Sequence, residues 1–474
     1  MNMRNVMMIG SSAVAVTLAL AAPALADTTE DLLSHLRSKG VLTASEFTTL
    51  SQRHQAETAR AAADAKAKVD AQVQAQVQAA KAAAAGDDKT IVRKADKGLG
   101  LKVGDVNIQL SGSINGFYVH DTGDSGPNTT VAGGVVNTNG NSSSVRNGLL
   151  PGYLKVDVTT TQEGFDLGAH FGIYPGINSV SWNGGANSAG QPQALGTSGA
   201  DFRQTYLTVG NKSLGELKVG RDIGLFGSDA ILNDMTLLGV GTAAANSSPS
   251  NTSLGRIGLG YIYTDFQPQI TYTTPTFAGF TASAGVFTPM VTAGSTEVND
   301  SPGFQGKLTY DFTAGGATGH LWGGFITQKH DQTGAQAGYT GTGFDVGAKL
   351  GYGPVGLTGY YYTGEGIGTT GLFILSATAS GSKRDSDGFY VQGTVKPIEK
   401  LTLGVSYGES NLDLASGEVN PTLVKQNSSW AFQTKYALTD WVSLVGEYTS
   451  TTSKAHGGNE ASSDAIALGA ILFF

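Results

Sequence analysis

The sequence contains no cysteine. That absence excludes disulfide bonds, thiolate metal sites and a lipidated N-terminal cysteine. Charged residues are scarce too, at 14% against roughly 25% in soluble domains. Disorder does not explain the scarcity, because 40% of the residues are hydrophobic and the net charge is only −8. The acidic balance also gives no reason to expect nucleic acid as a partner.

Long hydrophobic runs are absent after the N-terminus, so no later segment is long enough for a membrane-spanning helix. Glycine, by contrast, accounts for 67 of 474 residues, about twice the usual share of roughly 7%. A fold that meets lipid through alternate residues of its strands needs this mixture of little charge and moderate hydropathy.

Residues 1–26 have the parts of a secretory signal peptide. Arg4 supplies the positive charge, residues 6–20 form the apolar core, and Ala24-Leu25-Ala26 is the cleavage site. An uncleaved membrane anchor is the alternative, but Pro23 and the small-residue site favour cleavage. The mature chain is therefore expected to be exported.

Residues 27–85 differ in kind from the rest and predict a periplasmic helical segment. A short helix is expected over residues 28–39. Thr43-Ala-Ser-Glu46 is a capping box, and an Ala-, Gln- and Lys-rich helix follows it to about Ala85. The apolar stripe of this helix is thin, so it is expected to associate as a coiled coil, with a solvated single helix as the alternative. Residues 86–104 are expected to be a linker.

From residue 105 onward, apolar and polar residues alternate with period two, which is the pattern of β-strands. Val106, Ile108 and Leu110, for example, alternate with Asn107 and Gln109. Most of the alternating segments are long enough to cross a bilayer when tilted. Sixteen of them begin near residues 106, 148, 165, 201, 215, 267, 279, 303, 317, 342, 355, 386, 400, 427, 441 and 462.

The connections alternate between short turns and long loops rich in Gly, Ser, Thr and Asn. The long loops are residues 121–147, 175–200, 222–266, 288–302, 331–341, 365–385, 413–426 and 453–461. Such an alternation with an even strand number is the signature of an outer-membrane barrel, and lipid requires the sheet to close. The predicted fold is all-β: a 16-stranded antiparallel transmembrane β-barrel over residues 105–474, preceded by the periplasmic α-helical segment. A soluble β-sandwich or β-helix is the alternative.

The last strand ends the chain on an aromatic residue. One face of this strand is apolar to its end and is expected to face lipid. The residues of that face are Ile466, Leu468, Ala470, Leu472 and Phe474.

Three stretches resemble the Gram-negative general porins. Residues 202–210 (FRQTYLTVG) followed by residues 214–221 (LGELKVGR) are similar to the strand–turn–strand of that family, and residues 272–280 (YTTPTFAGF) are similar to one of its hairpins. The terminal Phe474 is a further shared feature, and the resemblance implies that the barrel-insertion machinery reads it. It also implies a homotrimer of 16-stranded barrels in which the third long loop folds into the lumen and narrows the pore.

The resemblance also predicts which residues form the pore constriction. Counting loops places residues 222–266 in the lumen. This loop contains Asp222, Asp229 and Asp234 and ends near Arg256, and Arg203 matches a wall arginine of the family. The loop is also apolar enough that an exposed position would favour aggregation. Family members often carry a basic residue where this chain has Thr271, so a thinner basic ladder is expected. Asp229 and Asp234, held in the narrow lumen, would attract permeant cations, and a weak preference for cations is therefore expected.

No catalytic, metal or cofactor site is predicted. The seven histidines are scattered without metal-ligand spacing, so an enzyme is not expected. The predicted function is an outer-membrane porin of a Gram-negative bacterium, embedded in outer-membrane lipid, through which small hydrophilic solutes and ions diffuse. A substrate-selective channel for a sugar, an organic acid or phosphate is one alternative, since the helical prefix looks like those of some selective porins. An envelope tether that contacts the cell wall through residues 27–85 is another.

Overall fold

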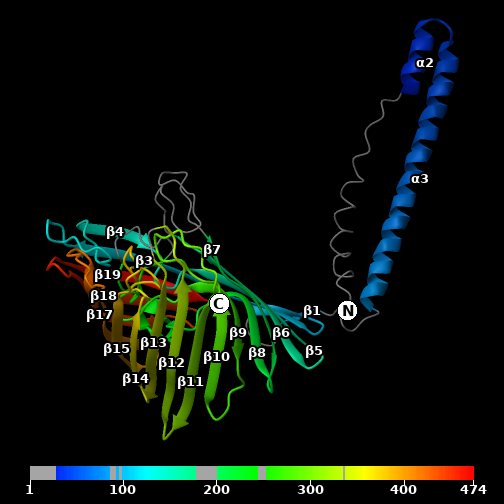
Figure 1. The fold of residues 1–474 in the computed structure, drawn as a ribbon. Coiled ribbons are helices and arrows are strands. Elements are labelled where there is room, and N and C mark those ends of the chain that lie inside the picture. Colours follow the sequence, from blue (N-terminus) through cyan, green and yellow to red (C-terminus); the bar gives the residue numbers. More distant parts are fainter. Residues whose placement is uncertain (1–27, 86–91, 95–98, 178–199, 244–251, 335–336) are drawn as a thin grey trace. The chain divides into compact units, whose positions relative to one another are not determined.

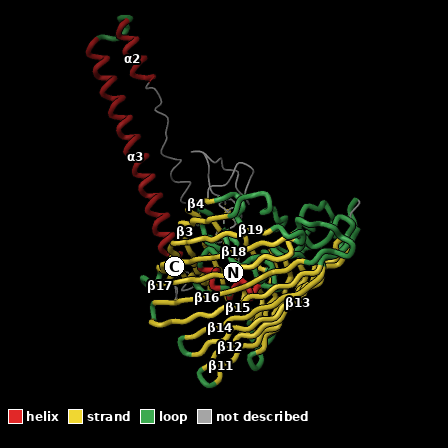
Figure 2. Tube along the Cα trace, turned by 90° about the vertical axis from the view of Figure 1, so that its left-hand side faces the viewer, coloured by secondary structure: helices red, strands yellow, loops and turns green. Residues whose placement is uncertain are grey.

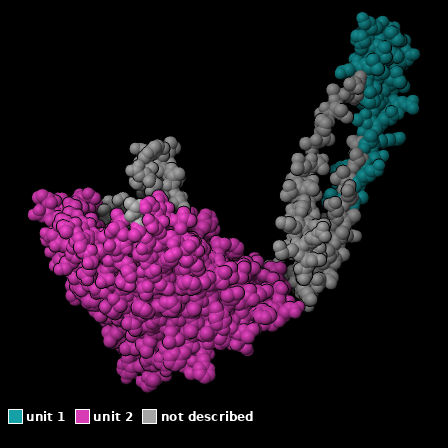
Figure 3. Space-filling view, in the orientation of Figure 1, with its two compact units in different colours: residues 1–90 teal, residues 91–474 magenta. Residues whose placement is uncertain are grey.

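The computed structural model describes residues 28–85, 92–94, 99–177, 200–243, 252–334 and 337–474. The predicted signal peptide lies outside the described residues. The chain divides into two compact units, residues 1–90 and 91–474 (Figure 3).

Two helices make up the described part of the first unit: α2 (Thr28–Ser38) and α3 (Ala44–Ala85). The predicted capping box is present, because the Thr43 N–H donates to Glu46 Oε2 at 2.9 Å and the Glu46 N–H donates to Thr43 Oγ1 at 3.3 Å. The two helices pack against each other, and the Arg37 guanidinium lies 4.8 Å from the centre of the Phe47 ring. None of the described helices is long and apolar enough to cross a membrane.

Antiparallel strands build the second unit (Figures 1 and 2). They are β1 (Val92–Lys94), β2 (Leu99–Val103), β3 (Val106–Gly123), β4 (Asn141–Arg146), β5 (Tyr153–Gln162), β6 (Phe165–Pro175), β7 (Ala200–Asn211), β8 (Gly215–Ile223), β9 (Phe266–Thr273), β10 (Phe280–Phe287), β11 (Gly303–Ala314), β12 (Ala317–His330), β13 (Tyr339–Tyr352), β14 (Val355–Glu365), β15 (Asp385–Ile398), β16 (Leu401–Leu412), β17 (Val424–Ala437), β18 (Val442–Ala455) and β19 (Glu460–Phe473).

Sixteen of the described strands, β3 and β5 to β19, form a closed barrel, which confirms the predicted fold. The closing pair is β19 and β3, in register from Ser463 opposite Gly123 to Phe473 opposite Ser113. Closure pairs the edges of the sheet, as a strand surrounded by lipid requires.

The segment predicted to begin near residue 148 is interrupted. β4 pairs with one half of β3 and β5 with the other half, and residues 147–152 between them leave the sheet. The Leu149 N–H donates to the Gly239 carbonyl at 2.9 Å and the Leu150 N–H donates to the Leu237 carbonyl at 3.2 Å. The strand therefore breaks where another part of the chain takes its backbone hydrogen bonds.

The structure corrects the prediction that residues 86–104 are a linker. Within it, β2 pairs with Val106–Leu110 of β3, and β1 pairs with β2. Leu99, Leu101 and Val103 alternate with Gly100 and Lys102, so the stretch has a strand pattern too short to stand out in the sequence. β2 forms because β3 extends beyond the end of β19 and leaves an edge to be paired.

Burial follows the predicted alternation along β19. Ile466 and Leu468 are 51% and 58% exposed on the outer face, whereas Ala465 and Ala467, which alternate with them, are buried on the inner face. Phe474 directly follows this strand and lies opposite Gly112, with which it exchanges two backbone hydrogen bonds of 3.0 Å. Its ring centre lies 6.3 Å from that of Trp441.

The absence of a side chain at Gly112 leaves the space in which the Phe474 ring packs. A Cβ at this position would lie 2.3 Å from Phe474 Cζ and 2.8 Å from the Tyr153 carbonyl oxygen. Gly112→Ala is therefore expected to displace the ring and to destabilise the barrel by about 1–3 kcal/mol. The check is the temperature at which the folded protein loses its compact electrophoretic mobility.

The matched control is Gly126→Ala, because a Cβ at Gly126 would meet no atom within 4 Å. Equal unfolding temperatures for both variants would show that the barrel does not depend on the ring being seated against Gly112.

Candidate functional site

The connection between β8 and β9, residues 224–265, is called loop 3 here. It contains helix α4 (Ser228–Asn233) and the 3₁₀ helix η2 (Met235–Leu238). Its described residues lie inside the barrel, since they hydrogen-bond to inward-facing side chains of several strands. Loop 3 therefore occupies the lumen, as the resemblance implied.

The start and the end of loop 3 are fixed to the wall formed by β11 to β15. The N–H groups of Leu225 and Phe226 donate to Gln305 Oε1 at 2.8 and 3.1 Å. The Gly227 N–H donates to Asp345 Oδ2 at 2.8 Å. An apolar cluster seals this contact, and it includes Phe226, Ala230, Ile231, Ile257, Tyr261, Trp322, Ile326, Tyr360, Tyr362, Phe373 and Tyr390.

The middle of loop 3 is fixed to the wall on either side of the closing pair. The N–H groups of Val240 and Gly241 both donate to Glu447 Oε1 on β18. Arg146 on β4 donates to the carbonyls of Ala243 at 3.1 Å and Thr252 at 2.6 Å. A second apolar cluster covers these bonds and contains Phe117, Val119, Val240, Ala243, Val445, Ala467 and Ile471. Loop 3 is thus anchored to two separate sectors of the wall.

Two of the predicted constriction residues, Arg203 and Asp222, lie on the strands before loop 3. Arg203 is the extra residue of a β-bulge, because Gly172 pairs with Gln204 and Ile173 pairs with Phe202. Its guanidinium is 3.0 Å from Asp201 and 5.3 Å from the centre of the Tyr174 ring. Asp222 belongs to β8 and not to the loop, and it forms an ion pair of 2.5 Å with Lys218.

Asp229 lies in α4 and faces β11 and β12. Its carboxylate is 2.7 Å from Lys307 Nζ and 3.3 Å from His320 Nε2. The negative charge of Asp229 is therefore balanced at the wall.

Asp234 and Arg256 are buried, with 4% and 0% of their surface exposed. Asp234 caps η2 by accepting the Thr236 N–H at 2.9 Å, and it also accepts the Tyr261 hydroxyl at 2.9 Å. Arg256 donates to Ser429 Oγ on β17 at 3.1 Å. The structure thus gives both residues contacts that hold loop 3, and neither lines the cavities described next.

Two cavities lie along the wall from β5 to β9. The upper cavity, at the end of the long loops, has a volume of about 1020 Å³. It is lined by Leu149, Leu150, Pro151, Lys155, Tyr174, Asp201, Arg203, Gln204, Arg221, Ile231, Leu232, Leu237, Leu254, Ile257, Tyr263, Asp265, Phe266 and Ile374, among others.

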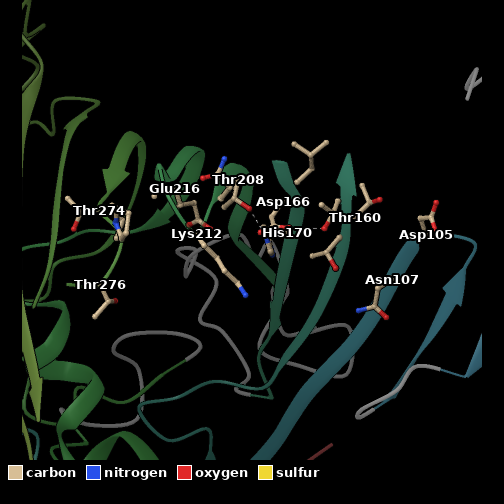
Figure 4. Close-up of a pocket in the computed structure, with 18 of the residues that line it drawn as sticks. Asp105, Asn107, Thr160, Asp166, His170, Thr208, Lys212, Glu216, Thr274 and Thr276 are labelled. Carbon is tan, nitrogen blue, oxygen red and sulfur yellow. Dashed lines mark hydrogen bonds between the residues drawn. The ribbon is translucent and has the colours of Figure 1, made fainter. Parts of the chain in front are cut away.

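The lower cavity, at the end of the short turns, has a volume of about 830 Å³. Figure 4 shows its polar side chains, which come from β3, β5 to β8 and the turns beside them. They include Asp105, Asn107, Thr160, Asp166, His170, Thr208, Lys212, Glu216, Thr274 and Thr276.

A chain of polar contacts on the inner wall joins the two cavities. Tyr174 donates to Gln204 Oε1 at 2.5 Å, and Gln204 Nε2 donates to Asp222 Oδ1 at 2.7 Å. Lys218, paired with Asp222, lies 5.0 Å from the centre of the Tyr206 ring. His170 stacks on Tyr206 at 4.6 Å and its Nδ1 is 2.5 Å from Asp157. We call this chain the polar track.

Most residues of the polar track were not predicted as site residues from the sequence. Its members occupy alternate, inward-facing positions of β5 to β8, so the period-two pattern could have placed them inside the barrel. The pattern could not show which inward positions loop 3 leaves uncovered. Thr271, where a basic residue was expected, is buried and donates to Gln269 Oε1 at 2.7 Å.

Because Asp234 is buried, it is expected to affect the stability of the protein more than its ion selectivity. Asp234→Ala removes a cap and leaves the Tyr261 hydroxyl without its acceptor, so stability is expected to fall by about 2–4 kcal/mol. The reversal potential in a salt gradient is expected to change little. The checks are the unfolding temperature in detergent and the reversal potential in a planar bilayer.

Asp413→Ala serves as the control, since Asp413 is an exposed loop residue whose side chain forms no hydrogen bond with the described residues, while its backbone N–H donates to the Asp385 carbonyl. A stable Asp234→Ala protein with a reversal potential moved toward anions would place this carboxylate in the ion path and contradict the anchoring role.

Comparison with known proteins gives a family and a fold. The family model of the Gram-negative porins matches residues 12–456. The outer membrane channel DcaP of Acinetobacter baumannii superposes with a TM-score of 0.58 at 16% identity, covering 81% of this chain and 99% of its own. OmpT of Vibrio cholerae, in its trimer form, gives 0.48 at 16% identity, covering 78% and 99%. OmpF of Salmonella typhi, in complex with daunomycin, gives 0.48 at 13% identity, covering 78% and 98%. No curated protein matches the chain.

Proposed function

This chain belongs to the Gram-negative porins, and we propose that small hydrophilic solutes and ions cross its barrel along the wall of β5 to β9. The protein is an outer-membrane channel for passive diffusion, and the family is one of channels rather than enzymes. The proposal concerns the route through the lumen, which passes the upper cavity, the polar track and the lower cavity in that order.

The packing of loop 3 is the observation that carries this route. Its two apolar clusters fill the lumen beside β11 to β15 and beside the closing pair. Water and ions are excluded from such packed apolar contacts. The two cavities flank the remaining wall, where inward side chains are polar. In barrels of this class the long loops are extracellular and the short turns periplasmic, so solutes enter at the upper cavity.

The proposed constriction lies where loop 3 comes nearest to Arg203 and to Asp222 of the polar track. Asp229, Asp234 and Arg256 act on the other side of loop 3, where they fix it to the wall. The charges on the route then come from paired groups such as Arg203–Asp201 and Lys218–Asp222. The carboxylates that supported a weak cation preference, Asp229 and Asp234, are neutralised by wall cations or withdrawn from solvent.

The absence of cysteine makes the route testable with a single introduced thiol. Leu232 lines the upper cavity and is 55% exposed. A negatively charged methanethiosulfonate reagent on Leu232→Cys is expected to lower single-channel conductance by roughly half or more, because a charged group then stands in a narrow path. The measurement is single-channel recording in a planar bilayer before and after modification.

Val209→Cys is the control, because Val209 is 36% exposed on the outer face of β7. Its conductance should not respond to the reagent. If mass spectrometry shows that the Leu232→Cys channel is modified and its conductance is unchanged, the upper cavity is excluded from the route.

The helical segment supports a proposal about assembly. Leu50 and Val73 on α3 are 40% and 43% exposed in the single chain, which leaves apolar surface for partner helices. We propose that α3 associates as a coiled coil within a homotrimer.

We also propose that residues 1–26 are removed as a signal peptide and that the barrel-insertion machinery recognises Phe474. A contact of residues 27–85 with the cell wall remains the alternative use of the segment.

The detergent-extracted protein is expected to have the mass of a trimer by light scattering. Removing residues 27–90 should lower the temperature at which the trimer dissociates, because the helices then no longer add to the interface. A monomeric mass for the full chain would refute the trimer, and an unchanged dissociation temperature would assign the interface to the barrel walls alone.

A further inference from the structure

The upper cavity carries more positive than negative charge. Its basic side chains are Lys155, Arg203 and Arg221, and its acidic side chains are Asp201 and Asp265. Arg203 and Asp201 form an ion pair of 3.0 Å. Within the part of the chain that the structure describes, Lys155 and Arg221 form no ion pair. One side of the cavity therefore attracts anions.

The side of the cavity formed by loop 3 is apolar. Ile231, Leu232, Leu237 and Leu254 contribute to it, and Ile374 joins them from the loop between β14 and β15. Leu232 and Ile374 remain 55% and 39% exposed, so they present surface to whatever occupies the cavity. Binding pockets for small organic molecules combine such an apolar surface with a few polar groups that fix orientation.

Tyr263 stands among the charged groups. Burial raises the pKa of Tyr263 to about 12, an effect that Arg203 opposes. Its hydroxyl is therefore protonated at neutral pH and can donate. It forms no hydrogen bond with any residue that the structure describes. A carboxylate oxygen is an acceptor suited to this donor.

We propose that the upper cavity binds amphipathic organic anions, with a carboxylate held by the basic side chains and Tyr263, and a compact apolar body against Leu232 and Ile374. This inference rests on the proposed function, since the anion reaches the cavity through the open channel. It narrows the channel's solutes to a chemical class and makes the cavity a selectivity site.

Other solutes fit this cavity less well. An inorganic anion would pair with the basic side chains but would leave the apolar side of the cavity exposed to water. An uncharged polyol would leave Lys155 and Arg221 without a counter-charge. An organic cation would meet repulsion from the excess positive charge. Only a solute with both an anionic and an apolar part satisfies both sides.

Benzoate, acetate and benzyl alcohol separate these contributions when added to the full-length protein in planar bilayers. Benzoate is expected to reduce the chloride current at a concentration about tenfold lower than acetate, because its ring covers apolar surface. Benzyl alcohol, which lacks the charge, should have little effect. Equal potency of benzoate and acetate would overturn the inference.

Two variants locate the effect. Leu232→Asn is expected to raise the blocking concentration of benzoate about three- to fivefold without changing that of acetate. Arg221→Gln should raise both about two- to fivefold. Val419→Asn and Lys425→Gln, at exposed positions of loops and strands outside the cavity, are the matched controls. Benzoate block that survives both Leu232→Asn and Arg221→Gln unchanged would place the binding elsewhere and refute the site.

Calorimetric titration of benzoate into the detergent-solubilised protein decides binding separately from conduction. A heat of benzoate binding that is measured for the unmodified protein and is absent in Leu232→Asn and Arg221→Gln supports the site. If that protein does not conduct, the proposed function alone fails. If the protein conducts but shows no heat of benzoate binding, the proposed function stands and the inference is overturned.

Discussion

The pairing of β19 with β3 is the constraint on which the rest of the structure depends. Backbone N–H and C=O groups in lipid must bond to protein, so the sheet has to close and cannot end. Closure fixes which residues face outward and which face the lumen, because side chains alternate along every strand. It also explains β2, which continues the row of β19 along β3 beyond Phe474 and pairs an edge that would otherwise stay open.

A closed barrel of this size has an interior that side chains of the wall alone do not fill. Loop 3 fills part of it, and buried polar groups hold the loop in place. Glu447 accepts two N–H groups, Asp345 accepts one, and Asp234 caps η2. Hydrogen bonds in a water-poor environment are stronger than hydrogen bonds in water, so these side chains fix the loop backbone more firmly than apolar contacts alone. The interruption between β4 and β5 is part of the same anchoring. There, backbone N–H groups of the wall donate to carbonyl groups of loop 3 and not to a neighbouring strand.

The arrangement separates two tasks that the same residue types perform. Charged residues under loop 3, such as Asp229 with Lys307, position the loop. Charged residues on β5 to β8, such as Lys218 with Asp222, line the uncovered wall. A carboxylate buried in a hydrogen-bonded network influences permeant ions weakly, because its charge is compensated locally. Along the proposed route, selectivity therefore depends on the groups that remain in contact with water in the two cavities.

The sequence by itself determined the strands and their alternation, and its resemblance to the porins predicted that the third long loop lies in the lumen. Period two, turn residues and an aromatic end are local properties, and they predicted the barrel and nearly every strand start. It did not determine which charges line the proposed route. Arg203 reaches the upper cavity through a bulge between β6 and β7, and Asp234 turns into the packed loop; both depend on contacts between residues far apart in the chain. Only the closed tertiary structure decides which inward positions loop 3 covers, because burial is a property of neighbours in space and not of neighbours in sequence.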